Sequence, residues 1–343
     1  MHNLSLYSRV VFATVLFIAV LSTVPVSLAA PAGNLFAAEV PVSERTSEAK
    51  EEATQRALAE VLVKVSGSLS IASEANANLI LEDAGSYVQQ FRYTSNGTLL
   101  VGFDGRKLQS EMRAAGLPVW GADRPSTLVW LAVDYGDGDR RILGADDQGE
   151  IRNEIEGHAA ARGVPLVWPL NDSTDRATVE ATDVWGGFTE NITVASRRYG
   201  TEGVLVARVS QGPDGPMYGT WDLNIEGDAT NWSGNFGDSI NRLADFYAER
   251  LSVASSSGPA TRVAMSIDGL TSAKAYADAI SAIEKLSVVE SVQVAQVSNQ
   301  RVVLDLTLRG DTTQVSRALG LSRLFEAETD ADNSATLAYR YTR

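Results

Sequence analysis

The 343-residue sequence contains no cysteine and only two histidines, His2 and His158. The absence of cysteine excludes thiol nucleophiles, disulfide bonds and metal or iron–sulfur sites built on thiolates. A serine–histidine–aspartate triad would need His158 as its base, because His2 lies in a segment that we expect to be removed. The sequence around His158 predicts a solvated helix, so we interpret this histidine as a surface residue. These shortages predict no bound cofactor and no metal site, and they favour a protein that is not an enzyme.

Positive charge is also scarce, with 29 lysine and arginine residues against 43 aspartate and glutamate residues. The formal net charge is −14, and the acidic side chains are spread along the chain as on a solvated surface. Such a chain lacks the basic face that nucleic acids and anionic lipids require. We therefore expect no nucleic-acid partner.

The first thirty residues have the three parts of a secretory signal peptide. A single arginine, Arg9, precedes an apolar run at 10–21, and small residues follow. Ser27 and Ala29 suit the positions three and one before a cleavage site, so we expect cleavage after Ala29. The alternative is an uncleaved membrane anchor, which Pro25 and the hydroxyl residues near it disfavour. We expect an exported protein with no stable membrane anchor after cleavage.

The chain that remains is too long for one hydrophobic core, so two or three domains are expected. The patterns predict three small modules of the α+β and α/β classes. We place the first at 30–121, the second at 126–254 and the third at 261–343. The stretch 255–260, rich in serine with glycine and proline, predicts a linker between the last two.

The first module is predicted to contain a strand at 36–42, a long helix, a weaker helix at 73–83, a hairpin and a closing helix at 106–115. Alanine and valine recur at helical spacing after Ser47, which we expect to cap the long helix, and Gly67 is expected to end it. The hairpin strands are placed at 88–94 and 99–103. Asn96 and Gly97 predict a two-residue turn between them.

In the second module strands alternate with helices, which predicts an α/β layer with a partly parallel sheet. The expected strands are 127–133, 165–168, 203–209, 218–225 and 232–236, and the expected helices are 147–162, 177–184, 190–199 and 239–251. In the third module the order βαββαβ predicts a ferredoxin-like domain. Its elements are placed at 262–267, 272–286, 288–297, 301–308, 311–319 and 335–341.

An acidic loop follows the first strand of the second module. Asp134, Asp137 and Asp139 place three carboxylates within six residues, and alternating acids and glycines can wrap Ca²⁺. The spacing differs from that of an EF-hand, because no glutamate stands at the twelfth position. A polar turn is the alternative that we favour.

All six tryptophans lie in the middle of the chain, at positions 120, 130, 168, 185, 221 and 232. Tryptophan can stack on sugar rings, but it is also a common core residue. Trp130 lies inside an apolar strand and is expected in the core. Trp185 and Phe188 lie in a glycine-rich loop, which makes them the candidates for ligand stacking. Packing inside the protein is the alternative that we favour.

Several segments resemble a proteobacterial family of exported proteins, domain of unknown function 2066. They are FAAEVPV at 36–42, KVSG at 64–67, YVQQFRY at 87–93, FD at 103–104, GLPVWG at 116–121, RP at 124–125, LVWL at 128–131 and WPLND at 168–172. The resemblance carries over no catalytic residue. More remotely, the order of elements is similar to the N-terminal module of flagellar assembly protein T and to the N-terminal domain of the Tol system's B protein. That similarity implies a periplasmic assembly or scaffolding role in a Gram-negative envelope.

These observations favour a non-enzymatic periplasmic scaffold or assembly factor that acts through protein–protein contacts, with an envelope protein as its partner. A module that binds peptidoglycan or another glycan through exposed tryptophan is one alternative. A carboxylate-dependent hydrolase is another. The hydrolase would require a pocket that holds an acid whose pKa is raised by burial.

Overall fold

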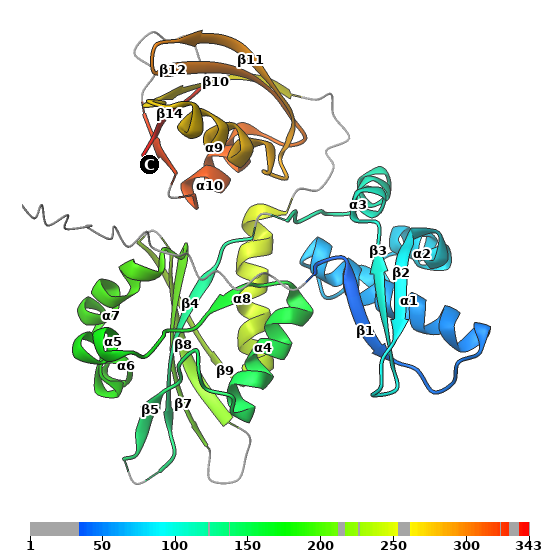
Figure 1. Ribbon diagram of the computed structural model, residues 1–343, viewed down its shortest axis with the longest axis vertical. Coiled ribbons are helices and arrows are strands. Elements are labelled where there is room, and N and C mark those ends of the chain that lie inside the picture. The colour runs from blue at the N-terminus through cyan, green and yellow to red at the C-terminus, as the bar shows by residue number, and fades with distance from the viewer. Residues whose placement is uncertain are drawn as a thin grey trace, which may run out of the picture.

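The computed structural model describes residues 34–122, 124–136, 138–211, 217–225, 227–252, 261–322, 324–328 and 336–342. The expected signal peptide and the expected linker at 255–260 lie outside these residues. The described chain forms three separate sheets with helices packed on them, which confirms the α+β class (Figure 1). None of the described helices combines the length and the apolar character that crossing a membrane requires.

The first module is an antiparallel sheet in the order β1-β3-β2, covered by helices. Its elements are β1 (Ala37–Pro41), α1 (Ser47–Ser66), α2 (Ala75–Glu82), β2 (Val88–Tyr93), β3 (Thr98–Phe103) and α3 (Gly105–Ala114). The apolar stripe of α1 is fully buried, as its spacing predicts, and packs on the sheet through Ala53, Ala57, Leu58, Val61, Leu62 and Val65.

The structure corrects the expected start of α1 and confirms its expected end. Thr46, and not Ser47, is the N-cap, because the Thr46 hydroxyl accepts a hydrogen bond from the Ala49 N–H at 3.1 Å. Gly67 adopts φ +75° at the other end, and its N–H bonds to the Val63 carbonyl. Both residues before the helix are good caps, and the sequence pattern alone does not distinguish them.

The hairpin turn is longer than the sequence predicted. Gly97 has φ +74°, but Asn96 does not have the positive φ that a two-residue type I′ turn needs at both positions. The Thr94 N–H instead donates to the Thr98 carbonyl at 2.9 Å, and their hydroxyls lie 2.5 Å apart. These contacts close the loop around three residues.

The middle module has a mixed sheet in the order β5-β4-β7-β8-β9, with β6 paired to the first half of β4. Its strands are β4 (Thr127–Asp134), β5 (Arg140–Ile142), β6 (Leu166–Val167), β7 (Gly203–Gln211), β8 (Met217–Ile225) and β9 (Asp228–Gly234). Its helices are α4 (Glu150–Arg162), α5 (Ser173–Thr178), α6 (Ala181–Gly186), α7 (Thr189–Ser196) and α8 (Phe236–Leu251). Strands β6 and β7 run parallel to β4.

Helices cover both faces of this sheet around β4 (Figure 1). Alternate residues of β4 point to opposite sides, so Val129, Leu131 and Val133 pack with α4 and α8. Leu128, Trp130 and Ala132 pack with α6 and α7. Burial on both faces explains why β4 is a continuous apolar run rather than an alternating one.

The third module has the strand order β11-β12-β10-β14-β13. Its elements are β10 (Thr261–Asp268), α9 (Ala273–Glu284), β11 (Val289–Ser298), β12 (Arg301–Leu308), α10 (Thr312–Gly320), β13 (Phe325–Ala327) and β14 (Leu337–Tyr341). β12 lies between β10 and β11 and is antiparallel to both, so β10, α9, β11 and β12 form one split βαβ unit, as the sequence predicts. The second half differs from a ferredoxin-like domain, whose last strand runs antiparallel to its first: β14 runs parallel to β10, because the short strand β13 reverses the chain after α10. Strand β13 is an addition at one edge.

The short elements are where the sequence predictions were wrong. Strands β5 and β13 were not expected, and each has only three residues. The single helix expected at 177–184 is two helices, α5 and α6, and β9 begins at Asp228 rather than at Trp232. Segments this short carry too few apolar positions to show a period.

Candidate functional sites

The connector between the first and second modules carries two buried side chains, Trp120 and Arg124. The guanidinium of Arg124 lies 3.5 Å from the centroid of the Trp120 ring. It donates hydrogen bonds to the carbonyls of Trp120 and Gly121 within the connector, at 2.8 and 2.7 Å. It also donates to the Lys64 carbonyl in the last turn of α1, at 2.6 Å, and to the Gly163 carbonyl after α4, at 3.5 Å. Arg124 therefore ties the connector to the ends of two helices from two modules.

A second arginine, Arg162 of the middle module, makes similar contacts. Arg162 lies in the last turn of α4 and is 2% exposed. Its guanidinium donates to the carbonyl of Gly67, the residue that ends α1, at 2.9 Å. It also donates to the side chains of Asn241 at 2.8 Å and Asp245 at 2.7 Å on α8. Arg162 thus joins α1, α4 and α8.

The groups around Arg124 and Arg162 stabilise the positive charges of the two guanidinium groups. Helix C-termini carry partial negative charge, and the ends of α1 and α4 both face the two guanidinium groups. Burial, and to a lesser extent the charge of Arg162, lowers the pKa of Arg124 to about 9, which still leaves it protonated at neutral pH. Helix ends, main-chain carbonyls and the carboxylate of Asp245 together compensate the two buried charges.

The third module meets the same connector. The Gly121 N–H donates to the Ser287 hydroxyl, between α9 and β11, at 2.8 Å. Leu321, which follows α10, belongs to the hydrophobic core of the middle module. At Gly67 the packing is so close that a Cβ would lie 2.5 Å from Ala248 Cβ on α8. We call Trp120, Gly121, Arg124 and Arg162 the junction.

A second candidate site lies where the parallel strands β4 and β7 end, and it brings together two of the sequence-predicted sets. Asp134, at the end of β4, accepts a hydrogen bond from Arg140 Nε at 2.9 Å. The Arg140 guanidinium in turn lies 4.2 Å from the centroid of the Trp185 ring. Hydrogen bonds from Arg140 and from the Gly136 N–H lower the pKa of Asp134. In open α/β sheets ligands bind at this edge.

Phe188 lies three residues after Trp185, directly before α7, and is 61% exposed. Its ring packs on Gly186, and a Cβ at the next residue, Gly187, would lie 3.4 Å from Arg208 Nη1. Arg208 is ion-paired with Asp222 on the neighbouring strand β8. We call Arg140, Trp185, Phe188 and Arg208 the aromatic–arginine patch.

The proposed calcium-binding residues have other partners in the structure. Asp134 pairs with Arg140, and Asp139 pairs with Arg141 at 2.6 Å. Asp137 lies outside the described residues. Groups of three or more side chains able to hold a metal ion do not occur in the part of the chain that the structure describes. The turn therefore binds arginine with two of the three carboxylates.

The tryptophans differ in their exposure. Trp120, Trp130, Trp168 and Trp221 are each at most 5% exposed, and Trp232 is partly buried against the same core as Trp221. Trp185 is half-buried, and one face of its ring is covered by Arg140. Phe188 is thus the more accessible of the two proposed stacking residues. His158 lies on α4 with its side chain 42% exposed and 3.9 Å from Glu154.

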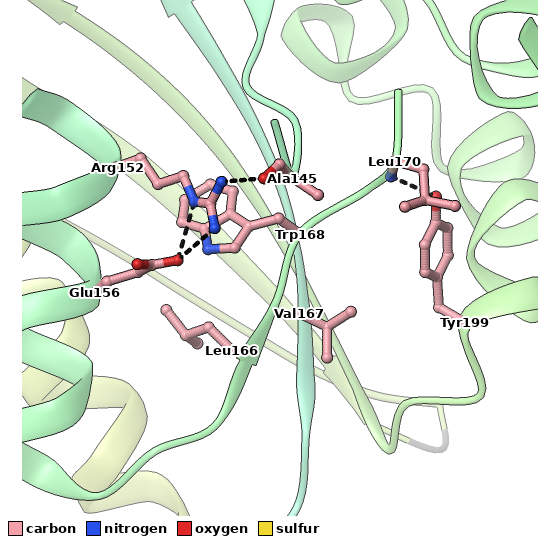
Figure 2. A pocket seen from close by; sticks show the side chains of 8 residues that line it. All are labelled: Ala145, Arg152, Glu156, Leu166, Val167, Trp168, Leu170 and Tyr199. Atoms are coloured by element: carbon pink, nitrogen blue, oxygen red, sulfur yellow. Dashed lines mark hydrogen bonds and ion pairs between the residues drawn. The ribbon is translucent and has the colours of Figure 1, made fainter. Parts of the chain in front are cut away.

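A small cavity lies at the carboxyl end of β6, and its volume is about 140 Å³. Figure 2 shows Arg152, Glu156 and Trp168 on one side of the strand and Leu170 and Tyr199 on the other. Ligand pockets typically occupy about 300–1,000 Å³, so this cavity is too small for a sugar ring with its substituents. It has room for a few water molecules.

The two charged side chains of this cavity, Arg152 and Glu156, bind each other. Arg152 pairs with Glu156 at 2.8 Å and donates to the Ala145 carbonyl in the loop before α4 (Figure 2). It also donates to the Asp147 carbonyl in the same loop, at 2.8 Å. The indole N–H of Trp168 is buried without a hydrogen-bond partner among the described residues. Glu156 is 43% exposed. Among the described residues, burial raises the pKa of one acid, Glu60, which lies on α1 in the first module and not at this cavity.

Next to the cavity, a network of ion pairs and hydrogen bonds holds the segment that follows β6 in place. The Tyr199 hydroxyl donates to the carboxylate of Asp175, which is 1% exposed, and accepts the Leu170 N–H at 2.8 Å. Burial, followed by the hydrogen bond with Asp175, raises the pKa of Tyr199. Arg198 makes two 2.9 Å hydrogen bonds to Asp172 and one of 3.0 Å to Asp175.

This network predicts that the stability of the fold depends on pH. The Arg198 hydrogen bonds, with the N–H groups of Thr174 and Asp175, lower the pKa of Asp172 below its ordinary value of 3.8. A carboxyl with a lowered folded-state pKa stabilises the fold above its unfolded pKa, and this contribution is lost as pH falls through the folded-state pKa. We expect Asp172→Asn to weaken the dependence of the urea midpoint on pH below about pH 4.

The matched control is Asp83→Asn, which changes an exposed carboxyl on the first module. Urea midpoints measured from pH 2 to pH 7 should show a flatter acid limb for Asp172→Asn than for this control. Parallel acid limbs in the two variants would contradict the assignment.

A family described as Domain of unknown function (DUF8605) has a sequence model that matches residues 29–121. None of the curated proteins matches the chain. The matching family is not domain of unknown function 2066, so the resemblance noted from the sequence stays a prediction. Over the first module, this chain is similar to a family whose function is unknown.

Proposed function

We propose that this protein is a non-enzymatic periplasmic scaffold that acts by binding an envelope protein. The export signal expected at 1–29 supports the location. The junction supports the scaffold role, because two buried arginines join the helices of the first two modules and the connector reaches the third. Surfaces on different modules are thereby held in a fixed relation, which a scaffold requires.

The observation that carries the protein-contact proposal is the composition of the aromatic–arginine patch. Phe188 is exposed, Trp185 is half-buried, and two arginines flank them. Aromatic residues and arginine are enriched in the energetically dominant centres of protein interfaces. Both arginines are already ion-paired with Asp134 and Asp222, so the patch has little net charge. The partner surface that fits it is apolar and uncharged.

The geometry of Trp185 favours a protein partner over a glycan. A sugar ring stacks on an open indole face, and Arg140 covers one face of Trp185 at 4.2 Å. A protein side chain can instead cover Phe188 from solvent without displacing the arginine. Glycan binding is therefore an outcome that the experiment must distinguish.

Photo-crosslinking in the native envelope tests the proposal. A photo-reactive phenylalanine analogue is placed at Phe188, and the matched control carries it at Leu79, which is 71% exposed on α2 of the first module. We expect a discrete protein adduct from position 188, absent from position 79 and reduced several-fold by adding Arg208→Glu. Equal adducts from both positions would contradict the proposal.

Glycan binding is tested in parallel with the purified protein. Saturable quenching of tryptophan fluorescence by peptidoglycan fragments, lost in Phe188→Ala, would replace the protein-contact proposal with the glycan alternative. A flat titration together with the specific adduct supports the scaffold.

A further inference from the structure

The third module has an edge strand that stands out for its lack of charge. β11 pairs with β12 on one side and forms the edge of the sheet on the other (Figure 1). All six residues from Gln293 to Ser298 are exposed. Residues 291–300 contain no charged side chain and no proline, although 21% of the whole chain is charged. Charged side chains and proline are common protections of edge strands against pairing, and this stretch has neither.

Two valines extend the apolar face of the sheet to this edge. Val294 is 47% exposed and Val297 is 62% exposed. They pair with Leu304 and Val302 on β12, which are buried in the core. In a regular strand, residues three apart point to opposite faces, but a register shift between Val294 and Gln296 places both valines on the core face. On the core face of the sheet, the side chains of β12 are therefore buried and the two valines of β11 are exposed.

We propose that a second copy of this chain occupies the β11 edge, by antiparallel strand pairing about a two-fold axis. The charge distribution selects this occupant. A formal net charge of −14 makes two copies repel each other across most of their surfaces, and the uncharged strand removes that repulsion where two edges meet. Two-fold pairing places the same patch on both sides, as closed dimers require.

The register follows from the valines. Residues opposite each other in an antiparallel ladder point to the same face. Pairing Val294 with Val297 of the partner subunit, and Val297 with Val294 of the partner subunit, brings all four exposed valines together on the core face. The two sheets would then join into one continuous sheet.

The area that one pair of strand edges can bury is small compared with the roughly 1,200–2,000 Å² that stable interfaces bury. We therefore expect a dimer that dissociates on dilution. This inference does not depend on the proposed function, because it concerns the third module and a second copy rather than the aromatic–arginine patch.

Sedimentation of the full chain without its signal, at concentrations from about 1 to 200 μM, measures the association. We expect the weight-average mass to rise toward twice the monomer mass over this range. Val297→Glu places two carboxylates in the interface and should keep the protein monomeric throughout. Leu79→Glu, a charge at a similarly exposed apolar position on the first module, should behave as wild type. A wild-type protein that stays monomeric at every concentration would overturn the proposal.

The absence of cysteine allows the register to be tested directly. A mixture of Val294→Cys and Val297→Cys, oxidised at high concentration, should form a disulfide-linked heterodimer in several-fold greater yield than Val297→Cys mixed with Leu79→Cys. Cysteines crosslink efficiently only when their Cα atoms lie within about 7 Å. Equal yields from the two mixtures would exclude this pairing.

Discussion

Arg162→Ala is expected to lower the free energy of unfolding by about 2–4 kcal/mol, because it removes the buried guanidinium that joins α1, α4 and α8. The side chain is 2% exposed and makes hydrogen bonds to Gly67, Asn241 and Asp245. Its removal leaves the Gly67 carbonyl at the end of α1 buried without this donor. Urea unfolding, followed by circular dichroism and by tryptophan fluorescence, measures the loss.

The matched control for this prediction is Arg106→Ala, which removes an exposed arginine from α3 and should change stability by less than about 0.5 kcal/mol. Arg162→Lys should lose less than Arg162→Ala, since lysine keeps the charge but lacks the planar fork that reaches two partners at once. If Arg162→Ala matched the control, the junction would not hold the modules together.

Trp130→Ala is expected to cost about 3–5 kcal/mol, the range found when a fully buried aromatic side chain is truncated. Trp130 is 0% exposed on the interior strand β4. Its indole N–H donates to the Ser196 hydroxyl at 2.9 Å, and its ring meets the Tyr199 ring edge-to-face at 6.4 Å between centroids. The same substitution therefore removes packing, a hydrogen bond and an aromatic contact.

Trp130→Phe separates these contributions. It keeps most of the buried ring and loses the N–H donor, while Ser196 still donates to the Ile192 carbonyl at 2.6 Å. We expect a loss of about 1–2 kcal/mol. Trp185→Ala, at a half-buried position on the same face of the sheet, should also cost less than Trp130→Ala. Equal losses for Trp130→Ala and Trp130→Phe would show that the hydrogen bond, and not packing, dominates.

Much of the fold could be predicted because it follows from short-range patterns. The stripe of α1 repeats at 3.6 residues, and Gly67 ends the helix because only glycine adopts φ +75° without strain. In the third module, Val302, Leu304, Leu306 and Leu308 alternate along β12, and all four are buried. Such periods are set by backbone geometry, so neighbouring residues are enough to show them.

The candidate sites were predictable only in part. Asp134, Asp139, Trp185 and Phe188 were chosen from the sequence as two unrelated sets. The structure relates Asp134 to Trp185 through Arg140, a residue that no motif marked. Arg208 joins the same patch from β7, at a distance in sequence that no local pattern reveals.

By itself, the sequence determined the α+β class, the split βαβ unit at the start of the third module, the cap at Gly67 and the uncharged run at 291–300. The tertiary structure decided that Arg124 and Arg162, which resemble ordinary surface arginines in the sequence, are buried between helix ends. It also decided that Val294 and Val297 share a face at a free edge. The reason is physical: a local pattern reports the residue's own backbone, whereas burial of a charge or exposure of a valine depends on which distant elements pack beside it.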